Sequence, residues 1–314
     1  MSVLDSEVSE LLTLLNEGFP RVHEMTGEQA RAAVAARRQP VTNLDDVRGT
    51  EEHTFDTGWT TLRVRVYHPH GQPPHPVVVF FHGGGFVFCD LDTHDGFCRA
   101  MSRHTGALVV SVDYRLAPEH RAPAAAHDAD AAVRWAARNA ARFGGDPARL
   151  VVAGDSAGGN LAAVACLLSR DHDGPPIAGQ VLAYPVIDPS FDTDSYRRYG
   201  DGYYNTEASM RWYWTQYLGE GLPLPSPRHL VAPLRAPGHA DLPAAVVVTA
   251  GLDPLRDEGH AYAKALREAG GTVVHRDYPG LFHGFLTFAS LRAAESARRL
   301  LWRDMRSLLD AGGR

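Results

Sequence analysis

The feature that most constrains this chain is a tight turn between an apolar strand and a helix of small residues. Residues 151–153 read Val-Val-Ala, residues 154–158 read Gly-Asp-Ser-Ala-Gly, and residues 161–165 read Leu-Ala-Ala-Val-Ala. The two glycines are required because side chains there would collide where the strand and the helix nearly touch. Such a turn holds its serine, Ser156, above the end of a buried strand with the hydroxyl exposed. The stretch therefore predicts a nucleophile elbow.

Short apolar runs alternate with helical patterns along most of the chain. The apolar runs cover residues 76–81, 107–112, 150–153, 181–183 and 244–250. The helical patterns between them cover residues 124–143, 160–170 and 255–269. This alternation predicts a mostly parallel sheet with helices on both faces. Before it, two amphipathic helices are expected within residues 6–40 and an antiparallel hairpin within residues 50–67.

One long stretch, at about residues 188–228, interrupts the alternation and is rich in aromatic and turn residues. Within it, four apolar residues recur at helical spacing: Met210, Tyr213, Trp214 and Tyr217. Such a stripe more often marks core packing than a binding surface. An insertion between two sheet strands nevertheless lies where lids of open α/β sheets lie, over the carboxyl ends of the strands.

Composition restricts the partners and the compartment. The 314 residues suit one large α/β domain with an insertion, or two small domains. With 31 basic and 37 acidic residues, a net charge of -6 and no basic stripe, nucleic acid and anionic membranes are not expected partners. The three cysteines have no CxxC spacing, and no secretory signal or long apolar run is present, so we expect a soluble, cytoplasmic protein.

Histidines are numerous, but their spacing does not indicate a metal site. The 16 histidines include His94, His120 and His127, each beside an acidic residue, and no His-Glu-x-x-His motif occurs. We therefore expect no metal and no other cofactor, and surface or structural roles for these histidines.

A serine hydroxyl is a poor nucleophile until a base takes its proton, and two partner residues follow the elbow along the chain. Asp253 comes just after the apolar run that ends at residue 250, and His283 lies in Gly280-Leu281-Phe282-His283-Gly284. The order Ser156, Asp253, His283 is the order found with this type of elbow. Asp257 is the alternative acid, although its position inside the following helix disfavours it.

A set of backbone donors for an oxyanion is expected near residues 82–85, His-Gly-Gly-Gly, which directly follow an early buried strand. Three glycines leave backbone N–H groups open to a ligand. Gly83, Gly84 and Ala157, the residue after the elbow serine, are the predicted donors. A phosphate-binding loop is the competing interpretation, but the Lys-Ser/Thr of a P-loop is absent and the spacing is not that of a dinucleotide site.

Five motifs together resemble the hormone-sensitive-lipase family of α/β-hydrolases. They are His-Gly-Gly-Gly at 82–85 with the acidic run 90–95, Asp-Tyr-Arg-Leu-Ala-Pro-Glu at 113–119, Gly-Asp-Ser-Ala-Gly-Gly-Asn at 154–160, Asp-Pro-Leu at 253–255 and His-Gly-Phe at 283–285. The resemblance covers roughly residues 50–312. Similarity to the bacterial esterases of this family implies an α/β-hydrolase fold with eight strands, mostly parallel. It also implies hydrolysis of short-chain carboxylic esters without a cofactor, often by a homodimer.

The same resemblance implies a division of the chain. Residues 1–45 would form an N-terminal helical cap segment, 46–187 the first part of the hydrolase core, 188–228 a cap insertion and 229–314 the second part of the core.

Amide hydrolysis or acyl transfer by Ser156, Asp253 and His283 is the alternative activity. A non-catalytic ligand receptor on this fold is the third possible function. Such a receptor usually lacks one of the three residues that correspond to Ser156, Asp253 and His283, and all three are present here.

Two positions depart from the family pattern and bear on substrate size. Cys89 stands where the family usually has glycine, and the bulky Phe282 precedes the predicted catalytic histidine. We expect short acyl groups to react fastest because Phe282 removes volume beside the histidine and the insertion supplies an aromatic roof. The predicted substrate-contacting residues are Phe86, Tyr184, Trp212, Trp214 and Phe282.

Overall fold

The computed structural model describes residues 4–312 and contains an eight-stranded sheet in the order β1-β2-β4-β3-β5-β6-β7-β8. The strands are β1 (Gly49–Asp56), β2 (Thr61–His68), β3 (His75–Phe81), β4 (Leu108–Asp113), β5 (Gly145–Asp155), β6 (Gly179–Ala183), β7 (Ala244–Leu252) and β8 (Val273–Phe282). Strand β2 pairs antiparallel with β1 and with β4, and all other neighbours are parallel. The predicted mostly parallel sheet and its leading hairpin are confirmed.

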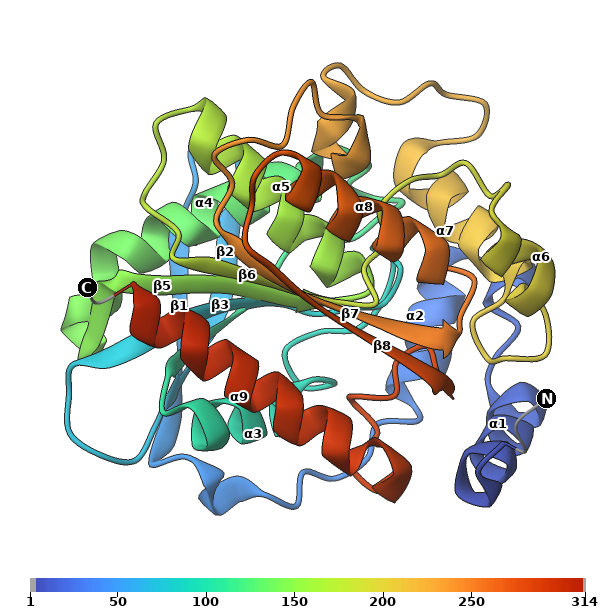
Figure 1. Cartoon of the computed structure of the whole chain (residues 1–314), viewed down its shortest axis with the longest axis horizontal. Coiled ribbons are helices and arrows are strands. Elements are labelled where there is room, and N and C mark those ends of the chain that lie inside the picture. Colours follow the sequence, from blue (N-terminus) through green and yellow to red (C-terminus); the bar gives the residue numbers. More distant parts are fainter. Residues whose placement is uncertain (1–3, 313–314) are drawn as a thin grey trace.

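Helices cover both faces of this sheet (Figure 1). Helices α4 (Ala124–Asn139), α5 (Ala157–Asp171) and α8 (Arg256–Glu268) lie on one face, and α3 (Asp95–Thr105) and α9 (Glu295–Ala311) lie on the other. The central strand β3 shows why both faces need cover. Val77 and Val79 pack into one core and Val78 and Phe80 into the other, because successive strand side chains point to opposite faces.

The remaining helices gather near the carboxyl ends of β7 and β8 (Figure 1). They are α1 (Ser6–Gly18) and α2 (Gly27–Ala35) from the N-terminal segment, and α6 (Asp194–Tyr199) and α7 (Glu207–Leu218) from the insertion. Side chains tie the two segments together. Asn16 of α1 bonds to the Gly202 carbonyl at 2.7 Å and to the Tyr204 N–H at 2.9 Å. Segments almost 190 residues apart in sequence are therefore in direct contact.

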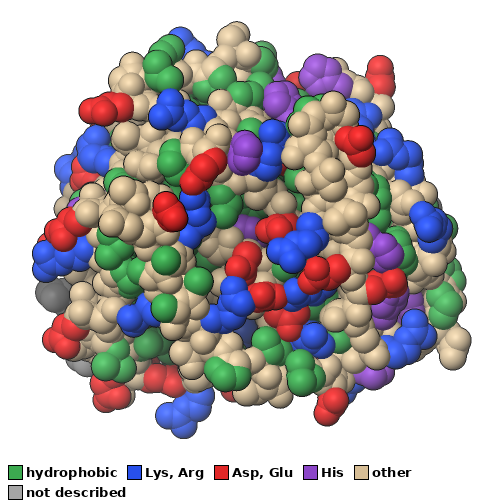
Figure 2. All heavy atoms as spheres, turned by 180° about the vertical axis from the view of Figure 1, so that it is seen from behind, with side chains coloured by type: hydrophobic (Ala, Val, Ile, Leu, Met, Phe, Trp, Pro, Cys, Tyr) green, Lys and Arg blue, Asp and Glu red, His purple; other side chains and the backbone are tan. Residues whose placement is uncertain are grey.

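Charges of both signs are interspersed on the surface, as Figure 2 shows for one face. Arg65, for example, contacts three carboxylates, those of Glu52, Asp92 and Asp95. Within residues 4–312, no helix combines the length and the apolar character needed to cross a bilayer.

Glu258 of α8 is a buried carboxyl group that joins this helix to the chain after β6. Its Oε1 accepts the Ile187 N–H at 2.7 Å, and its Oε2 has no hydrogen-bond partner among the described residues. Burial raises the pKa of Glu258 well above its usual range, although the bond from Ile187 acts in the opposite direction. The folded protein therefore favours the neutral form of this carboxyl group.

We expect Glu258→Gln to change how stability depends on pH. The unfolded chain ionises this carboxyl group near pH 4.3, about its ordinary pKa, whereas the folded chain resists ionisation. The free energy of unfolding of the wild type should therefore fall as the pH rises above about 4.3, relative to that of the variant. Urea unfolding of both proteins at pH 5 and at pH 9 measures the difference. A difference that does not grow with pH would contradict a neutral Glu258.

Candidate active site

The junction between β5 and α5 holds Ser156 in an unusual backbone conformation. Strand β5 ends at Asp155 and helix α5 begins at Ala157, and Ser156 between them has φ 55° and ψ -119°. A Cβ atom added to Gly154 would lie 2.2 Å from the Gly158 carbonyl oxygen. No side chain fits at that distance, so the glycine at 154 allows the sharp turn that presents the serine.

Asp253 and His283 lie next to this serine. The His283 Nε2 is 2.9 Å from the Ser156 Oγ, and its Nδ1 is 2.7 Å from the Asp253 Oδ2. A carboxylate only accepts hydrogen bonds, so Nδ1 carries the proton and Nε2 faces the hydroxyl with its lone pair. The three predicted residues, which come from the ends of β5, β7 and β8, are thus brought together in a line.

Asp253 is fully buried and its second carboxylate oxygen is also bonded. Oδ1 accepts the Leu255 N–H at 3.1 Å and the Asn205 Nδ2 at 3.4 Å. Asn205 belongs to the insertion, and sequence reasoning did not single it out. The insertion therefore contacts the acid that orients the histidine.

Asp257, the alternative acid, is engaged elsewhere. Its Oδ2 accepts the Ser195 N–H at 2.8 Å, and its Oδ1 pairs with the Arg256 guanidinium at 2.8 Å. Burial would raise the pKa of Asp257, but these two contacts hold it below its usual range. It joins α8 to α6 and makes no contact with His283.

The prediction that Gly83 is an oxyanion donor is wrong. The Gly83 N–H already donates to the Asp155 Oδ1 at 2.9 Å, so it is not available to a ligand. Gly84 and Gly85 line the cavity beside Ser156, and their N–H groups have no acceptor within residues 4–312. Ala157 is the first residue of α5, and its N–H has no partner inside the helix. The available donors are thus Gly84, Gly85 and Ala157.

Asp155 fixes the glycine loop against the elbow. Besides Gly83 it contacts the His94 Nε2 at 3.4 Å, and although burial acts to raise the pKa of Asp155, the nearby His94 holds it below its usual range. His82 is fully buried and stacks on Tyr114, and burial lowers its pKa to about 4. A neutral His82 and an ionised Asp155 are structural parts of the loop.

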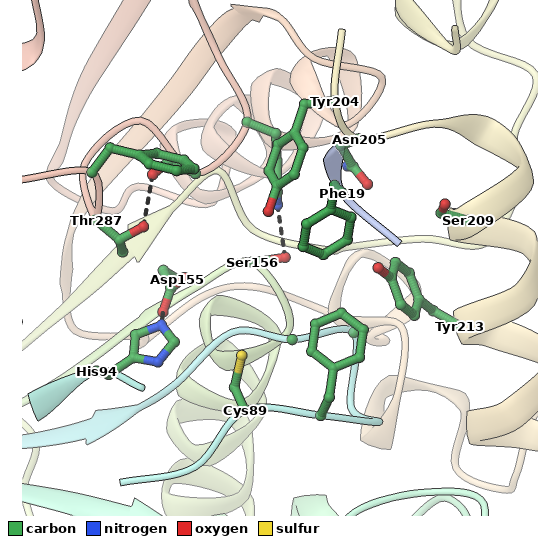
Figure 3. Close-up of a pocket in the computed structure, with 16 residues that line it drawn as sticks. Phe19, Cys89, His94, Asp155, Ser156, Tyr204, Asn205, Ser209, Tyr213 and Thr287 are labelled. Carbon is green, nitrogen blue, oxygen red and sulfur yellow. Dashed lines mark hydrogen bonds and ion pairs between the residues drawn. The ribbon is translucent and has the colours of Figure 1, made fainter. Parts of the chain in front are cut away.

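A small cavity opens over Ser156 (Figure 3). Its volume is about 130 Å³, below the roughly 300 to 1,000 Å³ typical of sites for drug-sized ligands. Five aromatic side chains contribute to its wall: Phe19, Phe88, Tyr204, Tyr213 and Phe288. Figure 3 shows Tyr204, Phe19 and Tyr213 on one side of Ser156, and Cys89 and His94 on the other.

The five aromatic residues predicted to contact the substrate do not line this cavity: Phe86, Tyr184, Trp212, Trp214 and Phe282. Phe282 is the last residue of β8 and is fully buried, because adjacent residues of an extended chain point to opposite sides and His283 occupies the cavity side. Tyr184 is also buried and packs against the His283 ring, with 4.9 Å between ring centroids. Both support the site from behind.

The other three lie around helix α7. Phe86 stacks on Tyr217 with ring centroids 3.9 Å apart, and the buried Trp214 packs beside them. Trp212 points toward the N-terminal segment, where its Nε1 donates to the Met25 carbonyl at 3.2 Å. These side chains hold the insertion in place and do not face the serine.

Sequence reasoning missed the residues that do form the wall. Ser209 and Tyr213 are four residues apart on α7, so they share one side of the helix, which faces the cavity. This four-residue spacing is visible in the sequence and indicates that Ser209 and Tyr213 lie on the same side of a helix. Phe19, Tyr204 and Phe288 come from loops, where no periodicity marks which side chains point inward.

Cys89 lines the cavity and has φ 68°, a left-handed conformation that favours glycine. In the part of the chain that the structure describes, no three His, Cys, Asp or Glu side chains are arranged to hold a metal ion.

Proteins with known activities resemble this chain along much of its length. A family profile described as the alpha/beta hydrolase fold matches residues 78–287. The carboxylic ester hydrolase LipN of Mycobacterium tuberculosis is 46% identical over 241 residues, which are 75% of this chain and 64% of that protein. The carboxylesterase NlhH of the same organism is 40% identical over 310 residues, or 95% of each chain.

Solved structures extend the match to nearly the whole chain. A thermostable esterase from Pseudomonas putida ECU1011 has a TM-score of 0.90 at 33% identity and covers 98% of both chains. A hyperthermophilic esterase from Pyrobaculum calidifontis has a TM-score of 0.87 at 36% identity and covers 97% of this chain and 98% of that chain. By fold and relatives, the chain is an enzyme of the serine-hydrolase class. It belongs to the α/β-hydrolase family, in the group related to hormone-sensitive lipase.

We expect Gly154→Ala to destabilise the protein strongly. The added methyl group would overlap backbone atoms of α5, which cannot move aside as a flexible side chain can, so the free energy of unfolding should fall by about 2 to 3 kcal/mol. Gly49→Ala is the matched control, since a Cβ atom there meets nothing within 4 Å. Urea unfolding compares the two variants. Equal stability of both would contradict the close strand-to-helix contact.

Proposed function

We propose that this protein is a carboxylesterase that hydrolyses short-chain carboxylic esters through Ser156, His283 and Asp253. The observation that carries the proposal is the continuous hydrogen-bond line from the Ser156 Oγ through the His283 ring to the Asp253 carboxylate, at 2.9 and 2.7 Å. The relatives support the substrate class, since they include a protein named ethyl acetate hydrolase, from Pseudomonas putida, at 37% identity over 237 residues.

In the first half of the reaction, the Ser156 Oγ attacks the carbonyl carbon of the ester. His283 takes the hydroxyl proton on Nε2, and Asp253 stabilises the charged ring that results. The bond between the carbonyl carbon and the alcohol oxygen then breaks, and the Nε2 proton passes to the departing alcohol. An acyl group remains on Ser156.

In the second half, water replaces the alcohol. His283 accepts a proton from water as the water oxygen attacks the acyl carbon, and it returns that proton to the Ser156 Oγ as the acid is released. In both halves the negative oxygen would rest against the N–H groups of Gly84, Gly85 and Ala157. One such donor is typically worth about 10² to 10³ in turnover.

The preference for short chains rests on the size and lining of the cavity. A volume of about 130 Å³ bounded by aromatic rings leaves little room beyond the scissile group. Overfilling a packed site typically costs about 1 to 3 kcal/mol, which outweighs the roughly 0.8 kcal/mol gained per buried methylene.

We expect Ser156→Ala and His283→Ala each to lower turnover of 4-nitrophenyl butanoate by about 10⁴ to 10⁶, because removal of either residue disables the whole unit. Asp253→Asn should lower it by about 10⁴, since the amide no longer fixes the imidazole tautomer. Asp257→Asn is the matched control and should cost far less. With native circular dichroism established for each variant, a larger loss in Asp257→Asn than in Asp253→Asn would overturn the assignment.

A second experiment separates ester hydrolysis from the alternative activities of the same residues. The C–N bond of an amide has partial double-bond character, which makes its carbonyl harder to attack. We expect kcat/KM for 4-nitrophenyl butanoate to exceed that for the matched anilide by at least about a hundredfold, equivalent to about 2.7 kcal/mol. Comparable rates would favour an amidase, and product ester formed from an added alcohol in place of free acid would favour an acyltransferase.

A further inference from the structure

A second, larger cavity lies next to the one over Ser156. It is bounded by α1 and the chain after it on one side and by the 200–209 region of the insertion on the other, and its volume is about 490 Å³. Both cavities are lined by the same three residues, Phe19, Tyr204 and Ser209. These shared residues are therefore the wall between the two spaces.

Two aromatic rings make up most of that wall. The Phe19 and Tyr204 rings meet edge to face, with centroids 5.0 Å apart and planes at 82°. This is a favoured geometry for an aromatic pair. On its far side, the Tyr204 ring also packs edge to face on Phe282 and Phe288, at 6.2 and 6.0 Å. Both rings lie on the same side of Ser156 (Figure 3).

The backbone of Tyr204 is held in place from outside the insertion. Tyr204 has φ 71°, a left-handed conformation that is strained for a residue with a side chain. The Asn16 side chain accepts the Tyr204 N–H and donates to the Gly202 carbonyl, which fixes the loop on both sides of this strained residue. Helix α1 therefore sets the position of the Tyr204 ring.

We propose that Phe19 and Tyr204 form a partition that determines how long an ester chain the enzyme accepts. The space behind it is lined by apolar side chains, Leu15, Pro20 and Ala208, and by polar ones, among them Arg21, His23 and Asp201. It is the binding site that an aliphatic chain of medium length would enter along the apolar side once the partition is removed. This inference rests on the proposed esterase function and names the residues that set its substrate range.

The test compares kcat/KM for 4-nitrophenyl acetate, butanoate, octanoate and dodecanoate. Each methylene that becomes buried should contribute about fourfold, from roughly 0.8 kcal/mol, so Phe19→Ala should raise the ratio of octanoate to butanoate by at least about tenfold. Tyr204→Ala should do the same. Tyr204→Phe keeps the ring and should leave the ratio within about twofold of the wild type.

Two further variants make the result specific. Ala208→Trp, added to Phe19→Ala, should fill the space behind the partition and return the ratio to its wild-type value. Leu14→Ala is the matched control on the same helix, because Leu14 is 67% exposed and lines neither cavity, and it should leave the ratio unchanged. Circular dichroism and melting temperature are measured for each variant.

Failure of the inference and failure of the proposed function give different results. If the wild type hydrolyses none of the four esters, the proposed function is wrong. If it hydrolyses butanoate but neither Phe19→Ala nor Tyr204→Ala, both folded, shifts the ratio, only the partition is wrong. If only Phe288→Ala shifts the ratio of octanoate to butanoate, the wall that limits chain length lies on the other side of Ser156 and the proposed partition is wrong.

Discussion

The close contact between β5 and α5 is the constraint on which the site depends. Glycines at 154 and 158 let the strand and the helix approach until no Cβ atom would fit, and this places Ser156 at φ 55° with its hydroxyl outward. The same contact reaches the neighbouring strand β3. A Cβ atom on Gly158 would lie 1.9 Å from the Phe81 carbonyl oxygen, so the end of β3 lies directly against the start of α5. The glycine loop that follows β3 therefore lies beside the serine, and the hydrogen bond from the Gly83 N–H to Asp155 fixes it there.

The 200–209 region of the insertion contacts both Asp253 and the cavity over Ser156. Asn205 donates to the buried Asp253, and its neighbour Tyr204 forms part of the cavity wall. Both residues lie in a loop that Asn16 fixes from the N-terminal segment. A displacement of α1 would therefore disturb the acid of the triad and the shape of the cavity together. This coupling gives a physical reason why residues far from the serine in sequence would influence both turnover and substrate size.

Much of the fold, and the three residues that the structure brings together at the candidate site, could be predicted from the sequence because the signals are local: apolar runs, a strand-turn-helix with two glycines, and polar residues directly after strands. The predictions that were wrong concern contacts between distant parts of the chain and the directions in which side chains point. The N–H of Gly83 is occupied by Asp155, 72 residues away, which no spacing in the glycine loop reveals. Phe282 is expected in the pocket because it adjoins His283, yet adjacent strand residues face opposite sides and Phe282 is fully buried. Phe19 reaches the cavity from a loop near the N-terminus, through packing that the sequence does not encode locally.

The central claim is that Ser156 carries the acyl group during turnover, and trapping that intermediate tests it most directly. The enzyme is mixed with 4-nitrophenyl butanoate, quenched in acid within the first turnover, digested and mapped by mass spectrometry. The account predicts one butanoyl group per chain, on the peptide that contains Ser156, and no butanoyl adduct in Ser156→Ala. Full hydrolytic activity with the adduct on another residue, or an adduct that persists at the same level in Ser156→Ala, would contradict it.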